Sequence, residues 1–207
     1  MPTDPRERNG FSLVEVLVVV AIATMVVLVV GNFGNNIAGL NTLVSLELGS
    51  KSDVSQTLQV MTEEIQSAET SAAGTYPIDS ASTSSFAFYS DINKNGMAEY
   101  VRYFYASSTI YKEEIDATGT PAVYPTSSAI VYDVIDNVLI PSSTPLFSYY
   151  GASYTGTQAP LAEPVGLSAI RLVGVTFEVQ ANQSSTMQAA PPQYFSQLID
   201  MRNLDSN

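Results

Sequence analysis

A run of twenty residues, 11–30, contains only three polar side chains, which are Ser12, Glu15 and Thr24. A helix of this length reaches roughly 30 Å, about the thickness of the hydrocarbon core of a bilayer. Arg6 and Arg8 precede the run, and basic residues hold the adjoining end of such a helix in the cytoplasm. The sequence therefore predicts a single membrane-spanning helix whose C-terminal side is translocated.

Glu15 is the unusual member of this run. Placing an ionisable side chain in the hydrocarbon core of a bilayer raises the free energy of insertion by a few kcal/mol, so such a residue usually has a function. A cleaved secretory signal fits poorly, since apolar residues continue after the small residues at 21–23 and the cut would fall inside the run. A plain signal anchor fits the length but gives no reason for Glu15. A buried core helix is a third alternative, although the run is longer and richer in β-branched residues than most.

The composition limits the kinds of catalysis and binding that are open to this chain. The chain has 8 basic and 20 acidic residues, a net charge of −12, and no cysteine or histidine. Thiolate chemistry and the commonest general base are therefore excluded, and carboxylate catalysis, as in glycoside hydrolysis, remains. The acidic balance repels a phosphate backbone, so we expect no direct nucleic-acid binding. The adjacent carboxylates Glu113, Glu114 and Asp116 are interpreted as a solvated strand end, and we expect no enzyme.

The stretch "GFSLVE" combines Gly10, Phe11 and, as the fifth residue counted from Phe11, Glu15. With the short basic leader before it and the apolar run after it, this stretch resembles the N-terminal motif of type IV prepilins and type II secretion pseudopilins. The resemblance implies that residues 1–10 are a leader, cut between Gly10 and Phe11 by a prepilin peptidase on the cytoplasmic side. It also implies that Phe11 is then N-methylated and that Glu15 is retained.

The resemblance offers a physical role for Glu15. After cleavage the amino group of Phe11 is a cation beside an apolar helix, and Glu15 lies one turn away or approaches the amine of a neighbouring subunit. An ion pair offsets part of the desolvation cost of each group, whereas an unpaired partner remains costly. We therefore expect Glu15 to set the register between subunits as their helices leave the bilayer and pack into a filament.

The helix is expected to continue beyond the membrane. Residues 11–31 are predicted as the transmembrane and filament-core part, and residues 32–73 as an amphipathic continuation. Glycine and asparagine at 31–36 predict a bend or local melting. Apolar residues at helical spacing form one stripe that we expect to pack on a sheet: Val54, Leu58, Met61, Ile65 and Ala68. Glu63 and Glu64 are placed off this stripe.

Residues 74–207 are predicted to form a β-rich globular domain. Alternating, aromatic-rich segments predict strands at 84–90, 99–106 and 109–115, and further strands are expected at 146–151, 167–180 and 194–203. Residues 129–140 are ambiguous between a strand and a short helix. The predicted fold class is α+β and pilin-like, with a long N-terminal helix packed by its second half on an antiparallel sheet. The last strands resemble those of minor pseudopilins of the J type.

The segment "DINKNGMAE" matches the first half of a calcium-loop pattern, with the candidate ligands Asp91, Asn93, Asn95 and Glu99. The match then fails, because Arg102 stands at the twelfth position, where a bidentate glutamate is needed. Asn95-Gly96 between two alternating runs is a strong hairpin signal. We therefore prefer a turn and keep calcium, the only cofactor considered, as the alternative.

Taken together, these patterns predict a non-enzymatic minor pilin or pseudopilin of a type IV pilus-like or type II secretion filament. The expected location is the cytoplasmic (inner) membrane, followed by the filament after processing. The partners implied are other pilins, the prepilin peptidase, the inner-membrane assembly platform and membrane lipids. Two alternatives remain: a membrane-anchored extracytoplasmic ligand-binding module that is not assembled into a filament, and a carboxylate hydrolase on a membrane stalk.

Overall fold

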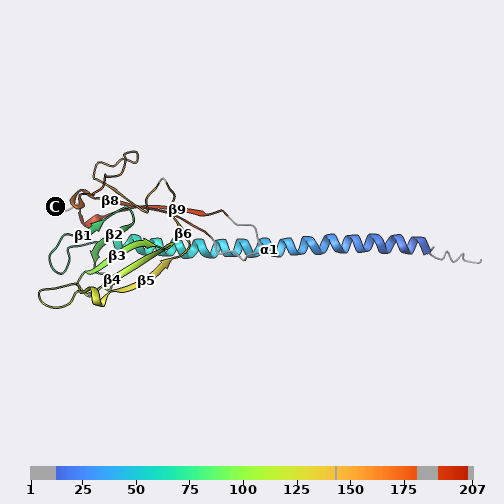
Figure 1. Ribbon diagram of the computed structural model, residues 1–207, viewed down its shortest axis with the longest axis horizontal. Coiled ribbons are helices and arrows are strands. Elements are labelled where there is room, and N and C mark those ends of the chain that lie inside the picture. The colour runs from blue at the N-terminus through green and yellow to red at the C-terminus, as the bar shows by residue number, and fades with distance from the viewer. Residues whose placement is uncertain (1–12, 143, 181–190, 205–207) are drawn as a thin grey trace, which may run out of the picture. The chain divides into compact units, whose positions relative to one another are not determined.

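The computed structural model describes residues 13–142, 144–180 and 191–204, without the side chains of residues 28–50. The chain divides into two compact units, Met1–Leu46 and Glu47–Asn207. Figure 1 shows one long helix, α1 (Leu13–Gln66), followed by strands. The predicted leader and its cleavage site, with Arg6, Arg8, Gly10 and Phe11, lie outside the described residues.

In the first unit, the described side chains of α1 at residues 13–27 are all exposed. Among the residues that the structure describes, no helix is both long enough and apolar enough to cross a membrane. The expected membrane-spanning segment therefore stays a prediction. Residues 31–36 are helical, so the predicted local melting is wrong; the cost of roughly 1 kcal/mol per glycine does not interrupt the helix there.

In the second unit, the end of α1 packs through the predicted apolar stripe. Val54, Met61, Ile65 and Ala68 are buried, and Leu58 is half-buried against the same core. The helix ends at Gln66, before the predicted end at residue 73. The chain leaves the helix early because the backbone N–H of Glu69 donates to the carbonyl of Tyr89. Ser71 Oγ then accepts the N–H groups of residues 73 and 75 in a tight turn.

Five antiparallel strands form the first sheet in chain order. They are β1 (Ile78–Ala81), β2 (Ser85–Ser90), β3 (Glu99–Ala106), β4 (Thr109–Ile115) and β5 (Ile130–Ile135). The strands predicted at 84–90, 99–106 and 109–115 are confirmed as β2, β3 and β4. The short strand β1 was not predicted.

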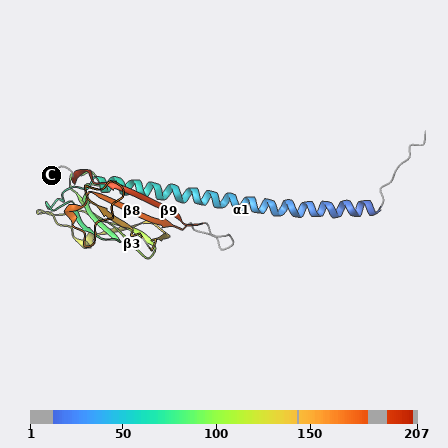
Figure 2. The ribbon, with the colours of Figure 1, turned by 90° about the horizontal axis from the view of Figure 1, so that it is seen from above.

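The second sheet contains β6 (Val138–Leu139), β7 (Phe147–Tyr150), β8 (Leu172–Val179) and β9 (Gln193–Asp200). Strand β8 pairs with β6 and β7 along one side and with β9 along the other; Figure 2 shows β8 and β9 side by side. The ambiguous segment 129–140 is two strands, because Asn137 has a positive φ of 56° and breaks the extended chain.

The predicted strands at 167–180 and 194–203 are shorter than expected. Each contains one 3-10 turn, η2 (Leu167–Ala169) or η3 (Arg202–Leu204), while η1 (Thr126–Ser128) precedes β5. One core is formed by the inner faces of both sheets and α1, with aromatic rings at its centre, including Phe86, Phe88, Phe147, Tyr149 and Phe177. The α+β, pilin-like fold class is confirmed.

Candidate functional site

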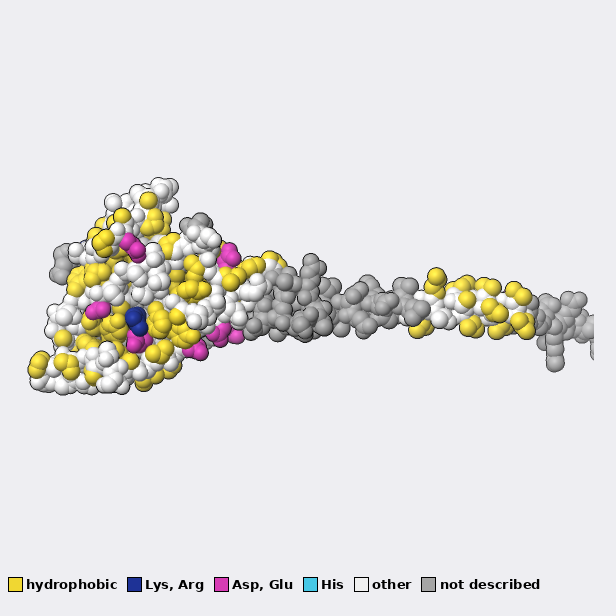
Figure 3. Space-filling view, in the orientation of Figure 1, with side chains coloured by type: hydrophobic (Ala, Val, Ile, Leu, Met, Phe, Trp, Pro, Cys, Tyr) yellow, Lys and Arg dark blue, Asp and Glu magenta, His cyan; other side chains and the backbone are white. Residues whose placement is uncertain are grey.

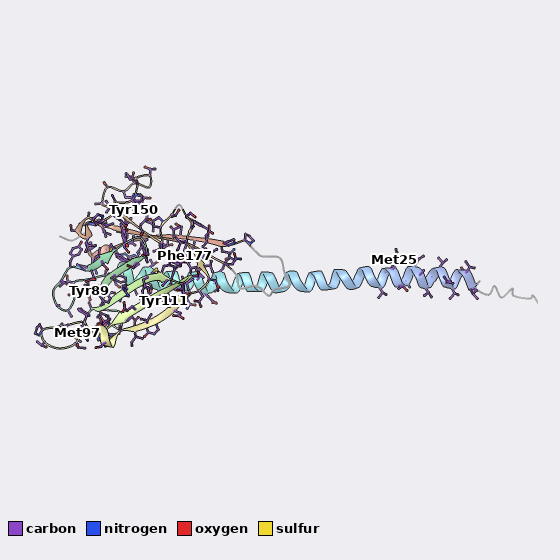
Figure 4. The ribbon with its side chains drawn as sticks, viewed as in Figure 1. Met25, Tyr89, Met97, Tyr111, Tyr150 and Phe177 are labelled. Carbon is purple, nitrogen blue, oxygen red and sulfur yellow. The ribbon has the colours of Figure 1, made fainter. Side chains whose placement is uncertain are left out.

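Glu15 lies in the first turn of α1, and its side chain is exposed. A carboxylate at this end of a helix is favoured by the helix dipole. Around it, valine, leucine, isoleucine and methionine side chains cover the described beginning of α1, as Figure 3 shows. Met25, labelled in Figure 4, projects from this stretch. An exposed apolar surface of this size marks a lipid or protein contact.

The predicted calcium segment is the connection between β2 and β3, and its antiparallel pairing confirms the predicted hairpin. Asp91 accepts the backbone N–H of Asn95 at 2.9 Å with Oδ1 and that of Gly96 at 2.8 Å with Oδ2. Gly96 has a φ of +86°, which a glycine adopts at little cost. The side chain of Asp91 thus closes the turn by its own hydrogen bonds.

Asn93 and Glu99 form the second half of this turn. Asn93 Nδ2 donates to Glu99 Oε1 at 2.8 Å, and the backbone N–H of Ile92 donates to Glu99 Oε2 at 2.9 Å. Burial raises the pKa of the Glu99 carboxyl. Asn95 Oδ1 accepts the N–H of Met97. In the described part of the chain no group of three or more acidic, histidine or cysteine side chains is arranged to hold a metal, and calcium binding stays a prediction.

A cluster of charged side chains links α1 to the first sheet. Lys112 Nζ lies 2.5 Å from Glu64 Oε1 and 2.5 Å from Glu114 Oε1. The hydroxyl of Tyr103 donates to Glu64 Oε2 at 2.6 Å. The side chains of Lys112 and Glu64 are only 11% and 12% exposed. We call Glu64, Lys112, Glu114 and Tyr103 the helix–sheet network, and it holds α1 at one position along the sheet.

Burial raises the pKa of Tyr103 well above 10, and the negative charge of Glu64 adds to this effect. Burial by itself would lower the pKa of Lys112, but the hydrogen bonds to Glu114 and Glu64 raise it by more, so the net pKa lies above 10.5. The network therefore holds Lys112 charged and Tyr103 neutral.

The interpretation of residues 113, 114 and 116 as one solvated strand end is wrong for its first two members. Glu113 forms an ion pair with Arg102 at 2.7 Å, whereas Glu114 binds Lys112. Their side chains are 15% and 22% exposed. Because adjacent strand residues point to opposite faces, the two carboxylates do not converge on one site.

Glu64 lies off the apolar stripe, as predicted, but its side chain is only 12% exposed, which was not predicted. Glu64 is three residues after Met61 and four before Ala68, so it borders the buried stripe. That spacing was a signal that sequence reasoning missed. Its partner Lys112 is 48 residues away, and no local pattern indicates this pairing.

Aromatic side chains gather on the face of the first sheet that points away from α1. Phe104 and Tyr111 stack with ring centroids 5.2 Å apart, and the guanidinium of Arg102 lies 4.6 Å from the Phe104 ring centroid. Tyr89 contacts both Tyr100 and Tyr124. Figure 4 shows Tyr89 and Tyr111 on different strands of this sheet. These contacts agree with packing between strands.

A long N-terminal helix followed by an antiparallel β domain is the architecture of a pilin-like protein. A family model described as the prokaryotic N-terminal methylation motif matches residues 5–31. This match supports the resemblance of the chain to type IV prepilins and pseudopilins, which are structural rather than catalytic proteins. No curated protein matches the chain, and the resemblance to the J type is not confirmed.

Proposed function

We propose that this chain is a minor pilin or pseudopilin, a non-enzymatic structural subunit of a type IV pilus-like or type II secretion filament. It is inserted in the inner membrane with its leader in the cytoplasm, cut between Gly10 and Phe11, and methylated on Phe11. It then assembles through its N-terminal helix with sister pilins on the inner-membrane platform. The match to the methylation motif over residues 5–31 is the observation that carries this proposal.

The exposed apolar side chains at the beginning of α1 support the same assignment. Leaving a valine or leucine side chain in water forgoes about 1.5–3 kcal/mol relative to burial, so this stretch is stable only in lipid or against other subunits. Lipid is as apolar as these side chains, and therefore the hydrophobic effect does not favour the filament over the membrane. An ion pair between Glu15 and the amine of Phe11 supplies an attraction that operates between helices.

Processing is tested by the intact mass of the protein made in a host that has its own prepilin peptidase. We expect a mature chain that begins at methylated Phe11. Gly10→Leu should leave the leader in place, because a bulky side chain does not fit where the peptidase accepts a small one. An uncut parent chain that begins at Met1 would instead support the anchored binding module.

Assembly is tested by Glu15→Ala. The variant should insert in the membrane at least as well as the parent and should still be cleaved. It should fail to enter filaments, because the buried amine of Phe11 then lacks its counter-charge, a loss of up to a few kcal/mol per subunit. The assay is the content of sheared filaments, or co-purification with sister pilins, beside a cleavage blot.

Glu63→Ala is the matched control, since it removes an exposed carboxylate from the same helix outside the motif. It should assemble like the parent. If Glu15→Ala also assembles like the parent, Glu15 has no role in subunit pairing and the proposed assembly mechanism fails.

A further inference from the structure

Strand β5 is one edge of the first sheet, as Figure 1 shows. One side of β5 pairs with β4. Among the described residues no other strand pairs with its second side. An edge strand of this kind offers unpaired N–H and C=O groups to an incoming strand.

The first three residues of β5 are apolar and exposed on both faces of the sheet. Ile130, Val131 and Tyr132 are 52%, 50% and 43% exposed. Natural edge strands are commonly blocked by lysine, proline or a bulge. In β5 the register shift and the single charge, Asp133, both lie after Tyr132. The devices that hinder pairing are therefore absent from residues 130–132.

A groove runs between this edge and α1. Tyr132 and Val134 line one wall, and Asp53 and Val60 of α1 line the other. Ile130 lies opposite Glu114 in the β4–β5 register. A strand added to β5 would place alternate side chains in this groove and the others over Val131, on the opposite face.

The charges around the edge are acidic. Lys112 and Arg102 face carboxylates of this chain, in the pairs with Glu114 and Glu113. Among the described residues, neither Asp53 nor Asp133 forms an ion pair. With a net charge of −12, a second copy of this chain would bring further negative charge to the edge.

We propose that the open edge of β5 binds an extended segment of another protein in which apolar and basic residues alternate. The backbone of that segment pairs with β5, as in recognition by strand addition. Its apolar side chains lie on the groove face over Ile130 and Tyr132, and its basic side chains lie on the opposite face, on the side of Val131 and Asp133. The partner is thus a protein that carries a basic strand.

The probe is a fluorescent peptide of about eight residues, an ordinary strand length, in which valine alternates with lysine. Binding to the purified full-length chain in detergent is followed by fluorescence anisotropy. We expect saturable binding of this peptide and none of a peptide with glutamate in place of lysine. A third peptide, N-methylated on alternate amides, should not bind, because it cannot donate along the strand.

Val131→Lys and Val123→Lys are the matched variants. Both valines are exposed, at 50% and 55%, but only Val131 lies on β5. Val131→Lys should weaken peptide binding about tenfold or more, since it places a lysine beside the basic side chains of the peptide. Val123→Lys should bind like the parent. Unchanged thermal melting of both variants shows that the fold is kept.

Equal binding by Val131→Lys and the parent would overturn the proposal. Binding of the N-methylated peptide would also overturn it, by showing charge attraction without strand pairing. A self-association seen by sedimentation that Val131→Lys abolishes, without peptide binding, would assign the edge to a second copy. The measurement requires neither leader cleavage nor filaments, so its failure is distinct from failure of the proposed function.

Discussion

Replacing Lys112 tests whether the helix–sheet network holds α1 on the first sheet. Lys112→Met keeps the length of the side chain and removes its charge, which leaves Glu64 with Tyr103 as its remaining partner. Removing one member of a buried ion pair costs about 3–5 kcal/mol. The total free energy of unfolding of a domain of this kind is about 5–15 kcal/mol. The variant should therefore lose a large fraction of its stability.

The assay is urea unfolding of the full-length chain in detergent, followed by near-ultraviolet circular dichroism of the tyrosines. With a slope of about 1–3 kcal/mol per molar urea, the midpoint should fall by roughly 2 M. Lys51→Met is the control, because Lys51 is an exposed lysine of the same helix. A substitution of this kind changes stability by about 0.5 kcal/mol or less.

A double variant separates the charge from the packing. Glu64→Gln with Lys112→Met removes both charges and keeps an oxygen that accepts from Tyr103. Replacing a whole buried pair is often nearly neutral, so the double variant should be more stable than Lys112→Met alone. If Lys112→Met costs less than about 1 kcal/mol, or if the double variant is the least stable, the network does not hold the helix as argued.

Three further results are expected. Calcium should leave the melting temperature unchanged if residues 91–99 form only a turn. A bound ion at about 100 times its dissociation constant would add about 2.7 kcal/mol to the free energy of unfolding and raise the melting temperature by several degrees. Such a shift, abolished by Asp91→Ala, would show a calcium site. Stability should fall as the pH rises above about 10, because Lys112, Tyr103 and Tyr149 have raised pKa values and the pKa of Tyr89 is raised to about 12. The folded state holds these protons more tightly than the unfolded state does, so deprotonation favours unfolding. A urea midpoint independent of pH between 9 and 11 would contradict this. Tyr149→Phe should cost about 1–3 kcal/mol in urea unfolding, since the hydroxyl donates to the carbonyls of Ser82 and Ser85, whereas no loss would show that water replaces it.

The sequence predicted best those elements whose signals are local. Strands β2, β3 and β4 follow one another with short connections and are rich in aromatic and β-branched residues. Strand β3 also alternates between buried and less buried residues over its first half, whereas β2 is buried along almost its whole length. Strand β1 escaped prediction because its four residues, Ile-Asp-Ser-Ala, have no such alternation. It is held by pairing with β2, a contact that depends on the whole sheet.

The candidate sites also differ in whether their signals are local or depend on contacts between distant residues. Residues 91–99 were predicted as a hairpin because Asp91, Asn95 and Gly96 act on their own neighbours, and the structure confirms the turn. The helix–sheet network was missed because Glu64 and Lys112 meet only after the helix has packed. The local sequence around a lysine in an alternating strand is the same whether that lysine is buried beside two carboxylates or exposed to solvent.

The net charge of the chain bears on how it assembles with other subunits. The proposed leader, residues 1–10, contains two acidic and two basic residues, so its proposed removal would leave the charge of −12 unchanged. In a filament made only of this chain every subunit would carry the same negative charge, and neighbouring subunits would repel one another wherever their charges lie within a Debye length of about 8 Å. Mixing with less acidic subunits relieves that repulsion, and a basic strand on β5 would do so at a defined place. The charge thus agrees with the proposed role of a minor subunit among different partners rather than with a filament built from this chain alone.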